Sequence, residues 1–75
     1  MRCLFRCTAK TPRVGDTSPK PITDVAFDAV AGTDNKTWST VVPFGHLVLA
    51  VDVPEALAAF EVGGTYYLDV SAVPA

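Results

Sequence analysis

The chain has 75 residues, of which 49% are hydrophobic, and a formal net charge of −2. This length allows one domain over residues 1–75 with a marginal core, because a small fold buries a smaller fraction of its unfolded surface than a large one. The longest apolar run, HLVLAV, is far shorter than the ~20 residues of a membrane helix, and no basic segment followed by an apolar stretch indicates secretion. We therefore expect a protein made in the cytoplasm, away from membranes, that gains stability by forming a homo-oligomer or by docking on a partner.

The charges are unevenly divided along the chain. Residues 1–20 hold five basic side chains and one acidic side chain, a net charge of +4, whereas residues 21–75 hold one basic and seven acidic side chains, a net charge of −6. Opposite patches of this kind can steer a partner or orient two copies. The alternative is a solvated surface whose charges are unevenly placed, since exposed charges contribute little. The acidic balance argues against general nucleic-acid binding.

The first half of the chain predicts two strands separated by a long loop. Residues 1–10 alternate between apolar and polar side chains, as in a strand with one buried face, with Leu4 out of step. The inward set is Cys3, Phe5, Cys7 and Ala9, and the outward set is Arg2, Arg6, Thr8 and Lys10. Residues 11–21 contain three prolines and predict a loop. Residues 22–30 alternate again and predict a second strand.

The middle of the chain predicts a hairpin. Residues 37–42 are rich in β-branched and aromatic side chains, and residues 46–53 alternate with the leucines and valines on one face. Pro43 and Gly45 suit a tight turn between them. We therefore expect a third and a fourth strand that pair with each other.

The last third predicts a short helix and a final strand. In residues 52–60, Asp52 is placed to act as the N-cap with Glu55 completing a capping box, and Gly63 follows as a helix stop. Residues 65–73 alternate once more. Five short strands and one helical turn predict an all-β fold, a small five-stranded antiparallel barrel or sandwich.

The two cysteines and the single histidine do not form a recognisable catalytic or metal site. Cys3 and Cys7 lie about 13 Å apart along a strand, beyond the ~7 Å between Cα atoms that a disulfide allows. Together with His46 they supply three soft ligands, one fewer than a structural zinc site needs. Thiols on the inward face of a strand are expected to be inert. We predict no enzymatic activity, no cofactor and no metal site.

The residues that we expect to contact a partner are exposed cations and aromatics. They come from the N-terminal strand, the proline-rich loop, the Pro-Phe-Gly turn and the last strand, where two adjacent tyrosines must face opposite ways. The candidate partner-binding residues are Arg2, Arg6, Lys10, Arg13, Lys20, Phe44 and Tyr67.

The second half of the chain resembles small β-rich proteins, mostly without an assigned function, encoded in tailed-bacteriophage genomes. In that family an N-K-[ST]-aromatic segment leads to a Pro-x-Gly turn, and the chain ends in a motif like F-x-x-G-x-x-Y-Y-x-D. The matching residues here are Asn35, Lys36, Thr37, Trp38, Pro43, Gly45, Phe60, Gly63, Tyr66, Tyr67 and Asp69. This chain departs from the pattern at Phe44, Val53 and Val70. The resemblance implies a phage context and no catalytic residue.

Two functional hypotheses follow from these features. The first is a virion accessory protein, most concretely a capsid decoration or cement protein that binds phage coat subunits and is located in the virion. Its basis is an apolar content of 49%, more than one small core easily hides. The alternative is a free intracellular module, similar to an OB-fold, that binds single-stranded nucleic acid by base stacking or that inhibits a host protein.

Overall fold

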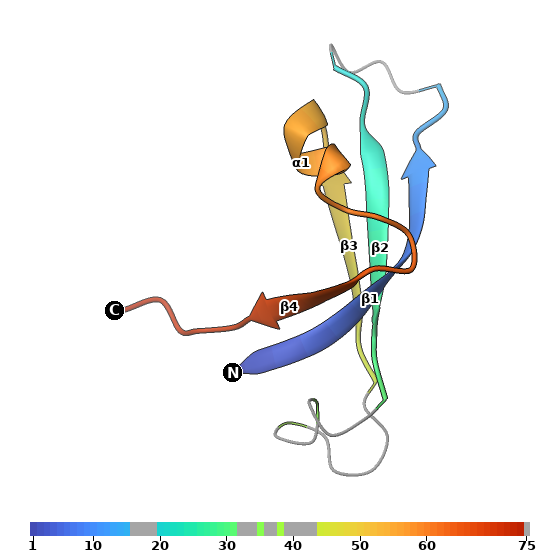
Figure 1. Ribbon diagram of the computed structural model, residues 1–75. Helices are drawn as coiled ribbons and strands as arrows, with labels where there is room; N and C mark the ends of the chain where they lie inside the picture. The colour runs from blue at the N-terminus through green and yellow to red at the C-terminus, as the bar shows by residue number, and fades with distance from the viewer. Residues whose placement is uncertain (16–19, 32–34, 36–37, 39–43, 75) are drawn as a thin grey trace.

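The computed structural model describes residues 1–15, 20–31, 35, 38 and 44–74. These residues form one antiparallel sheet of order β3-β2-β1-β4 (Figure 1). Along the chain, a short helix connects the two edge strands, β3 and β4. The elements are β1 (Arg2–Pro12), β2 (Thr23–Ala29), β3 (His46–Val51), α1 (Pro54–Ala58) and β4 (Thr65–Asp69). The predicted all-β fold with one short helix is confirmed.

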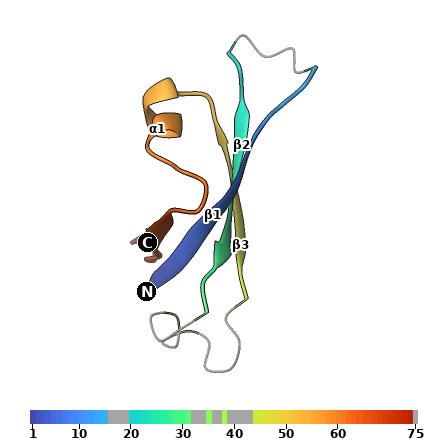
Figure 2. The ribbon, with the colours of Figure 1, turned by 45° about the vertical axis from the view of Figure 1, so that its right-hand side comes forward.

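The sheet is open, which corrects the prediction of a closed barrel or sandwich. Among the described residues four strands are present, and β3 and β4 each have a neighbour on one side only. β4 and the first part of β1 run at a wide angle to β2 and β3, whereas the second half of β1 runs alongside β2, so β1 is bent and the sheet is strongly twisted (Figures 1 and 2). Most of the expected third strand, residues 37–42, lies outside the described residues, and so does its hairpin; Trp38 lies in a turn. β3 instead pairs with β2.

A β-bulge in β1 inverts the side-chain alternation of that strand. The register with β2 shifts between Cys7 and Ala9, and the hydroxyl of Thr8 donates a hydrogen bond of 3.3 Å to the carbonyl of Ala26. An extra residue in one strand sends every later side chain to the opposite face. Lys10 consequently pairs with Val25 and lies on the core face. The predictions that Lys10 points outward and Ala9 inward are therefore wrong.

The core is confined to the two central strands. The five buried hydrophobic residues are Cys3, Phe5, Cys7, Val25 and Phe27. All five occupy positions that the sequence predicts to point inward. Three of them precede the bulge in β1, and the other two lie in β2. Phe27 is the centre of the packing and meets the rings of Phe60 and Tyr66 edge to face, at centroid distances of 5.2 and 6.0 Å.

The helix α1 begins one residue later than the predicted cap requires. Pro54 occupies its first turn, and Val53 is the N-cap in an extended conformation with no side-chain hydrogen bond. The predicted Asp52 cap is therefore wrong, because Asp52 stands one position too early. At the C-terminal end of α1, backbone carbonyls accept hydrogen bonds from Lys10. Its ammonium donates to the carbonyls of Leu57 at 3.0 Å and Phe60 at 2.8 Å. A cation at this end also compensates the helix dipole.

Candidate protein-binding surface

The core face of the sheet carries an apolar groove of about 160 Å³. All four strands contribute to it, together with the segment that follows α1. Its lining residues are Phe5, Phe27, Leu47, Leu49, Phe60, Tyr66, Tyr67 and Leu68. Leu49 is 38% exposed although it faces the core side of the sheet opposite Val25. The five-residue helix α1 is too short to cover this face.

The molecule is more extended than a compact chain of the same length. Its radius of gyration is 14.3 Å, whereas about 11 Å is typical. Its accessible surface is 5448 Å², against about 4,400 Å² expected for a folded protein of this mass.

Among the described residues, no strand pairs with the outer side of β3 or β4, so both edges present backbone groups that this part of the chain leaves unpaired. At the β4 edge, Met1 and Val70 exchange two hydrogen bonds, of 2.7 and 2.8 Å, and Cys7 donates to the carbonyl of Gly64 at 2.9 Å. Bonded pairs recur at every second residue of an antiparallel ladder. The backbone groups of Thr65 and Tyr67, and likewise of Asp69, therefore point away from the sheet.

The same rule applies to β3 at the other edge. The amide of Ala29 donates to the carbonyl of Gly45 at 3.0 Å, so the bonded residues of β3 are the odd-numbered ones. The backbone groups of His46, Val48 and Ala50 then face outward, and all three residues are exposed. A strand edge of this kind is a template for pairing with another chain.

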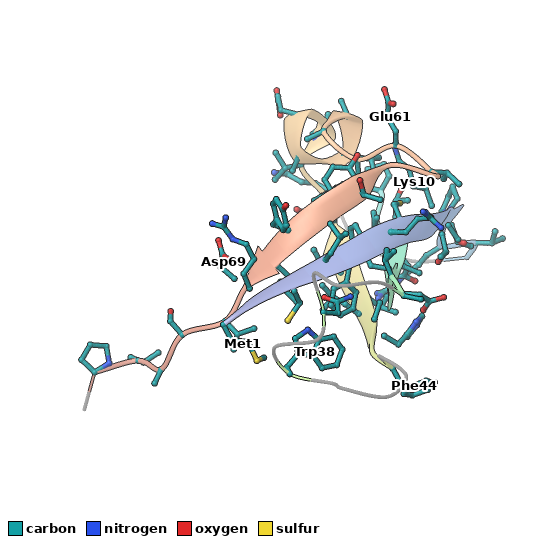
Figure 3. The ribbon with its side chains drawn as sticks, turned by 60° about the horizontal axis from the view of Figure 1, so that its bottom comes forward. Met1, Lys10, Trp38, Phe44, Glu61 and Asp69 are labelled. Atoms are coloured by element: carbon teal, nitrogen blue, oxygen red, sulfur yellow. The ribbon has the colours of Figure 1, made fainter. Side chains whose placement is uncertain are left out.

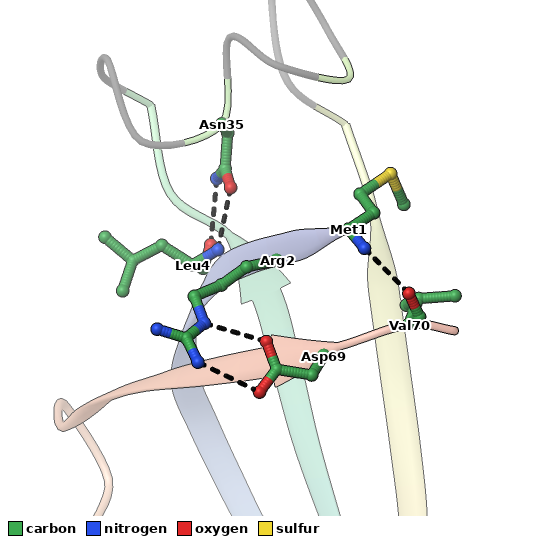
Figure 4. A network of polar contacts seen from close by, with 6 residues as sticks. All are labelled: Met1, Arg2, Leu4, Asn35, Asp69 and Val70. Atoms are coloured by element: carbon green, nitrogen blue, oxygen red, sulfur yellow. Dashed lines mark hydrogen bonds and ion pairs between the residues drawn. The ribbon is translucent and has the colours of Figure 1, made fainter.

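The predicted basic surface is largely neutralised within the molecule. Arg2 forms a bidentate ion pair with Asp69, at 2.8 and 3.3 Å (Figure 4). Its guanidinium also lies 4.9 Å from the centre of the Tyr67 ring. The hydrogen bond from Arg2 lowers the pKa of the Asp69 carboxyl below its ordinary value. Arg13 pairs with Asp24 at 2.9 Å. The basic and acidic parts of the sequence thus meet in the folded chain.

Of the predicted partner-binding residues, the structure brings Arg2 and Tyr67 together but places Lys10 and Phe44 far from each other (Figure 3). Lys10 is bound to the carbonyls at the end of α1, and Figure 3 places it near Glu61, at the opposite end of the molecule from Phe44. Phe44 is 89% exposed beside the start of β3, and Tyr67 is 60% exposed on β4. Arg6 and Lys20 are exposed as expected; neither forms an ion pair with a described residue.

Asn35 has a structural role that the sequence did not reveal. It is fully buried, accepts a hydrogen bond from the amide of Leu4 at 2.7 Å and donates to the carbonyl of Leu4 at 2.8 Å (Figure 4). Its amide also donates to the carbonyl of Val30 at 2.6 Å, and the indole of Trp38 donates to its oxygen at 3.1 Å. Asn35 therefore continues the β1–β2 ladder past the end of β2.

The cysteines lie where the sequence predicted. Cys3 and Cys7 are both buried and both free. Across the described part of the chain, no group of three or more His, Cys, Asp or Glu side chains is placed to hold a metal ion. His46 contacts Asp28 at 2.6 Å on the exposed outer face of the sheet. In the same part of the chain, no helix is long and apolar enough to cross a membrane.

A scan against protein-family models and searches of curated proteins and of solved structures found no match to this chain. The groove and the two strand edges are therefore interpreted from their own geometry.

The sequence identified the apolar residues that line the groove, but it did not reveal that the folded chain leaves them exposed. Leu47, Leu49, Tyr66 and Leu68 lie on the predicted apolar faces of their strands, which places them inside a closed core. The available signal was the high apolar content combined with a helix of about two turns, since a helix this short covers little of a sheet. The outward direction of the edge strands depends on the pairing order, which alternation does not reveal.

Proposed function

We propose that this protein is a non-enzymatic assembly module that completes its core by docking on a larger protein partner. The observation that carries the proposal is the open apolar groove on the core face. Burial of apolar surface is the main driving force of protein association.

The most concrete form of the proposal is a virion accessory protein that decorates or cements a capsid by binding coat subunits. The resemblance to small phage proteins supports a phage context. The flat shape of the molecule supports a role on a capsid surface. The extents are 42 × 35 × 19 Å, so a single sheet could lie against a capsid surface. Contact with several neighbouring coat subunits would bury the apolar groove that α1 leaves exposed.

The nucleic-acid alternative gains little support from the charge distribution, because Arg6 and Lys20 are the two cations of residues 1–20 without a partner among the described residues. Arg2 and Arg13 pair with carboxylates, and the ammonium of Lys10 binds backbone carbonyls. A single-strand-binding groove needs cations that are free to contact phosphates. The apolar groove is the better-supported contact surface.

Mass spectrometry of purified phage particles tests the virion proposal. We expect the protein to co-purify with particles through a density gradient, in a fixed ratio to the coat protein. A host lysate expressing the protein without coat protein is the matched control, because nothing in it should carry the protein into the particle fraction. Absence from purified particles would overturn the virion role.

A further inference from the structure

We propose that two copies of this chain pair through their β4 edges, antiparallel and in the register that sets Tyr67 of one copy opposite Tyr67 of the other. This pairing joins two open sheets into one and brings Tyr66 and Leu68 of each copy beside the groove of the other. The dimer needs no coat protein, so it goes beyond the proposed function and does not depend on it.

The backbone of β4 fits this register. Among the described residues no strand pairs with its outer side, and Thr65, Tyr67 and Asp69 direct their amide and carbonyl groups outward. An antiparallel copy centred on Tyr67 sets outward groups against outward groups, because Tyr67 meets Tyr67 and Thr65 meets Asp69. Each such pair exchanges two main-chain hydrogen bonds. All five residues of β4 take part, whereas a shifted register pairs fewer of them.

The charges on the outer face of the sheet favour a second copy as the occupant. On this face β1 sets Arg2 beside Asp69 and Arg6 beside Thr65. In the dimer, a row of side chains runs from Arg2 through Asp69 to Thr65 and Arg6 of the second copy, and the two-fold symmetry repeats this row. Asp69 then lies between two arginines.

The new charge contact is within reach of the side chains. Adjacent strands are ~4.8 Å apart, so the backbones of Asp69 and of Arg6 in the second copy are about 10 Å apart. The long guanidinium side chain can cross the small Thr65 to approach the carboxylate. Arg6 is exposed and forms no ion pair with a described residue of its own chain. Opposite charges of this kind fix the partner and the register.

The remaining positions of β4 set apolar and aromatic side chains against each other. On the outer face the two Tyr67 rings, each 60% exposed, meet between the charged rows. On the core face Tyr66 lies opposite Leu68 of the second copy, and both residues line the groove. Cross-strand pairs of this kind stabilise a sheet. The two-fold axis of such an isologous pair is perpendicular to the sheet, so both grooves face the same side and their apolar surface becomes continuous.

The β3 edge offers no such match. In the register that pairs all its outward groups, two antiparallel β3 strands would set His46 opposite Ala50. The β2 neighbours of these two residues are Asp28 and Asp24, so the row would carry a carboxylate at each end. Each of these carboxylates already has a partner within its own copy. Pairing through β3 therefore gains no opposite charge, and charge selects β4.

Sedimentation of the full protein is the first test. We expect a reversible dimer whose population rises with protein concentration. A protein that stays monomeric up to about 1 mM would overturn the proposal.

Cysteine cross-linking tests the register. Hydrogen-bonded antiparallel partners have Cα atoms ~5.5 Å apart, within the range of a disulfide. Tyr67→Cys should therefore give a covalent dimer when dissolved oxygen oxidises the two thiols. Thr65→Cys is the matched control on the same edge, because the two copies of residue 65 would lie about 13 Å apart. Equal cross-linking of the two variants, or none in Tyr67→Cys, would overturn this register.

A pair of proline variants locates the edge. Tyr67→Pro removes an outward amide of β4, and Val48→Pro removes an outward amide of β3, so neither breaks a hydrogen bond of the sheet. We expect Tyr67→Pro to raise the dissociation constant of the dimer by at least about tenfold and Val48→Pro to leave it unchanged. Equal effects would count against β4, and an effect of Val48→Pro alone would assign the dimer to β3.

Charge variants keep the test valid if a proline variant fails to fold. Arg6→Glu sets carboxylates on both sides of Thr65 in the dimer and should raise the dissociation constant by at least about tenfold, and by less at high salt. Lys20→Glu is the matched control, because it changes the net charge equally at an exposed position outside the four strands. Equal effects of the two variants, or none, would contradict the contact between Arg6 and Asp69.

The failures of the two proposals can be told apart. A protein that dimerises through β4 but is absent from particles would overturn the virion role and leave the dimer standing. A monomeric protein that is present in particles would do the reverse. If the protein is monomeric alone and Tyr67→Pro weakens its binding to particles, the β4 edge belongs to another protein and the second copy is overturned.

Discussion

The two central strands and the outer part of this molecule differ sharply in burial. β1 and β2 supply all five buried hydrophobic residues of the described chain, and their polar groups are tied together by Asn35 and by the bulge at Thr8. The outer elements β3, α1 and β4 contain no buried residue. The centre therefore holds the fold together, whereas the outer elements form a surface that a partner can complete.

The largest contrast should come from truncating an apolar side chain in each part. Phe27→Ala removes the ring that packs on Phe60 and Tyr66 and should lower the free energy of unfolding by about 4 kcal/mol. Leu49→Ala, at a position 38% exposed, should lower it by about 1 kcal/mol or less. Urea denaturation measures both values. Similar losses at the two positions would remove the distinction between centre and edge.

The next largest effect should follow from Asn35→Ala. The substitution leaves the amide of Leu4, the carbonyl of Val30 and the indole of Trp38 without their partner, whereas the carbonyl of Leu4 keeps the amide of Val30. Unpaired buried polar groups cost about 1–3 kcal/mol each, of which water can recover a part, so we expect a loss of about 3 kcal/mol.

Urea denaturation with tryptophan fluorescence checks this value, because Trp38 is the single tryptophan. Asn35→Asp is the informative companion variant, since it can still accept from Leu4 but cannot donate to either carbonyl. It should also be destabilised. A loss below about 1 kcal/mol in Asn35→Ala would show that Asn35 does not hold the chain to β1.

A smaller effect should follow from Lys10→Met, which keeps an apolar stem but removes the ammonium from the end of α1. We expect a loss of about 1 kcal/mol, because two backbone carbonyls lose a charged donor. Lys20→Met is the matched control, since Lys20 is exposed and makes no polar contact with a described residue. Equal stability of the two variants in thermal unfolding would contradict the helix-end role of Lys10.

The smallest effect should be the pH dependence that Asp69 brings to the exposed β4 edge. Arg2 lowers the pKa of this carboxyl in the folded state below its ordinary value of 3.8. The folded protein then binds fewer protons than the unfolded chain, so the contribution to stability is present above the ordinary pKa and is lost as the pH falls through the folded pKa.

Carboxyl chemical shifts followed by NMR during an acid titration measure this pKa. In Arg2→Gln the pKa of Asp69 should rise towards its ordinary value, and the acid-dependent part of the stability should shrink. An unchanged pKa in the variant would show that the ion pair does not form in solution.

Some features could be predicted from single residues and their spacing. The inward side chains of β1 up to Cys7, those of β2, and the burial of both cysteines follow from alternation, because a strand with one buried face must alternate. The predicted alternation failed at Lys10, because a bulge is set by how two strands pair and leaves no signal in one strand alone. The charge division was visible in the sequence, but the pairing of Arg2 with Asp69, 67 residues away, was not.

The sequence by itself determined the local periods, namely strands with an apolar face and one short helix. The predicted helix stop at Gly63 is wrong, because α1 ends at Ala58 with Ala59 as its C-cap, and Gly63, with a φ of 91°, lies in the turn that follows. Only the tertiary structure decided the strand order, and with it the two open edges, the exposed groove and the partners of the arginines. The physical reason is that alternation depends on residues next to each other, whereas pairing, register and residual exposure depend on contacts between distant segments of the chain.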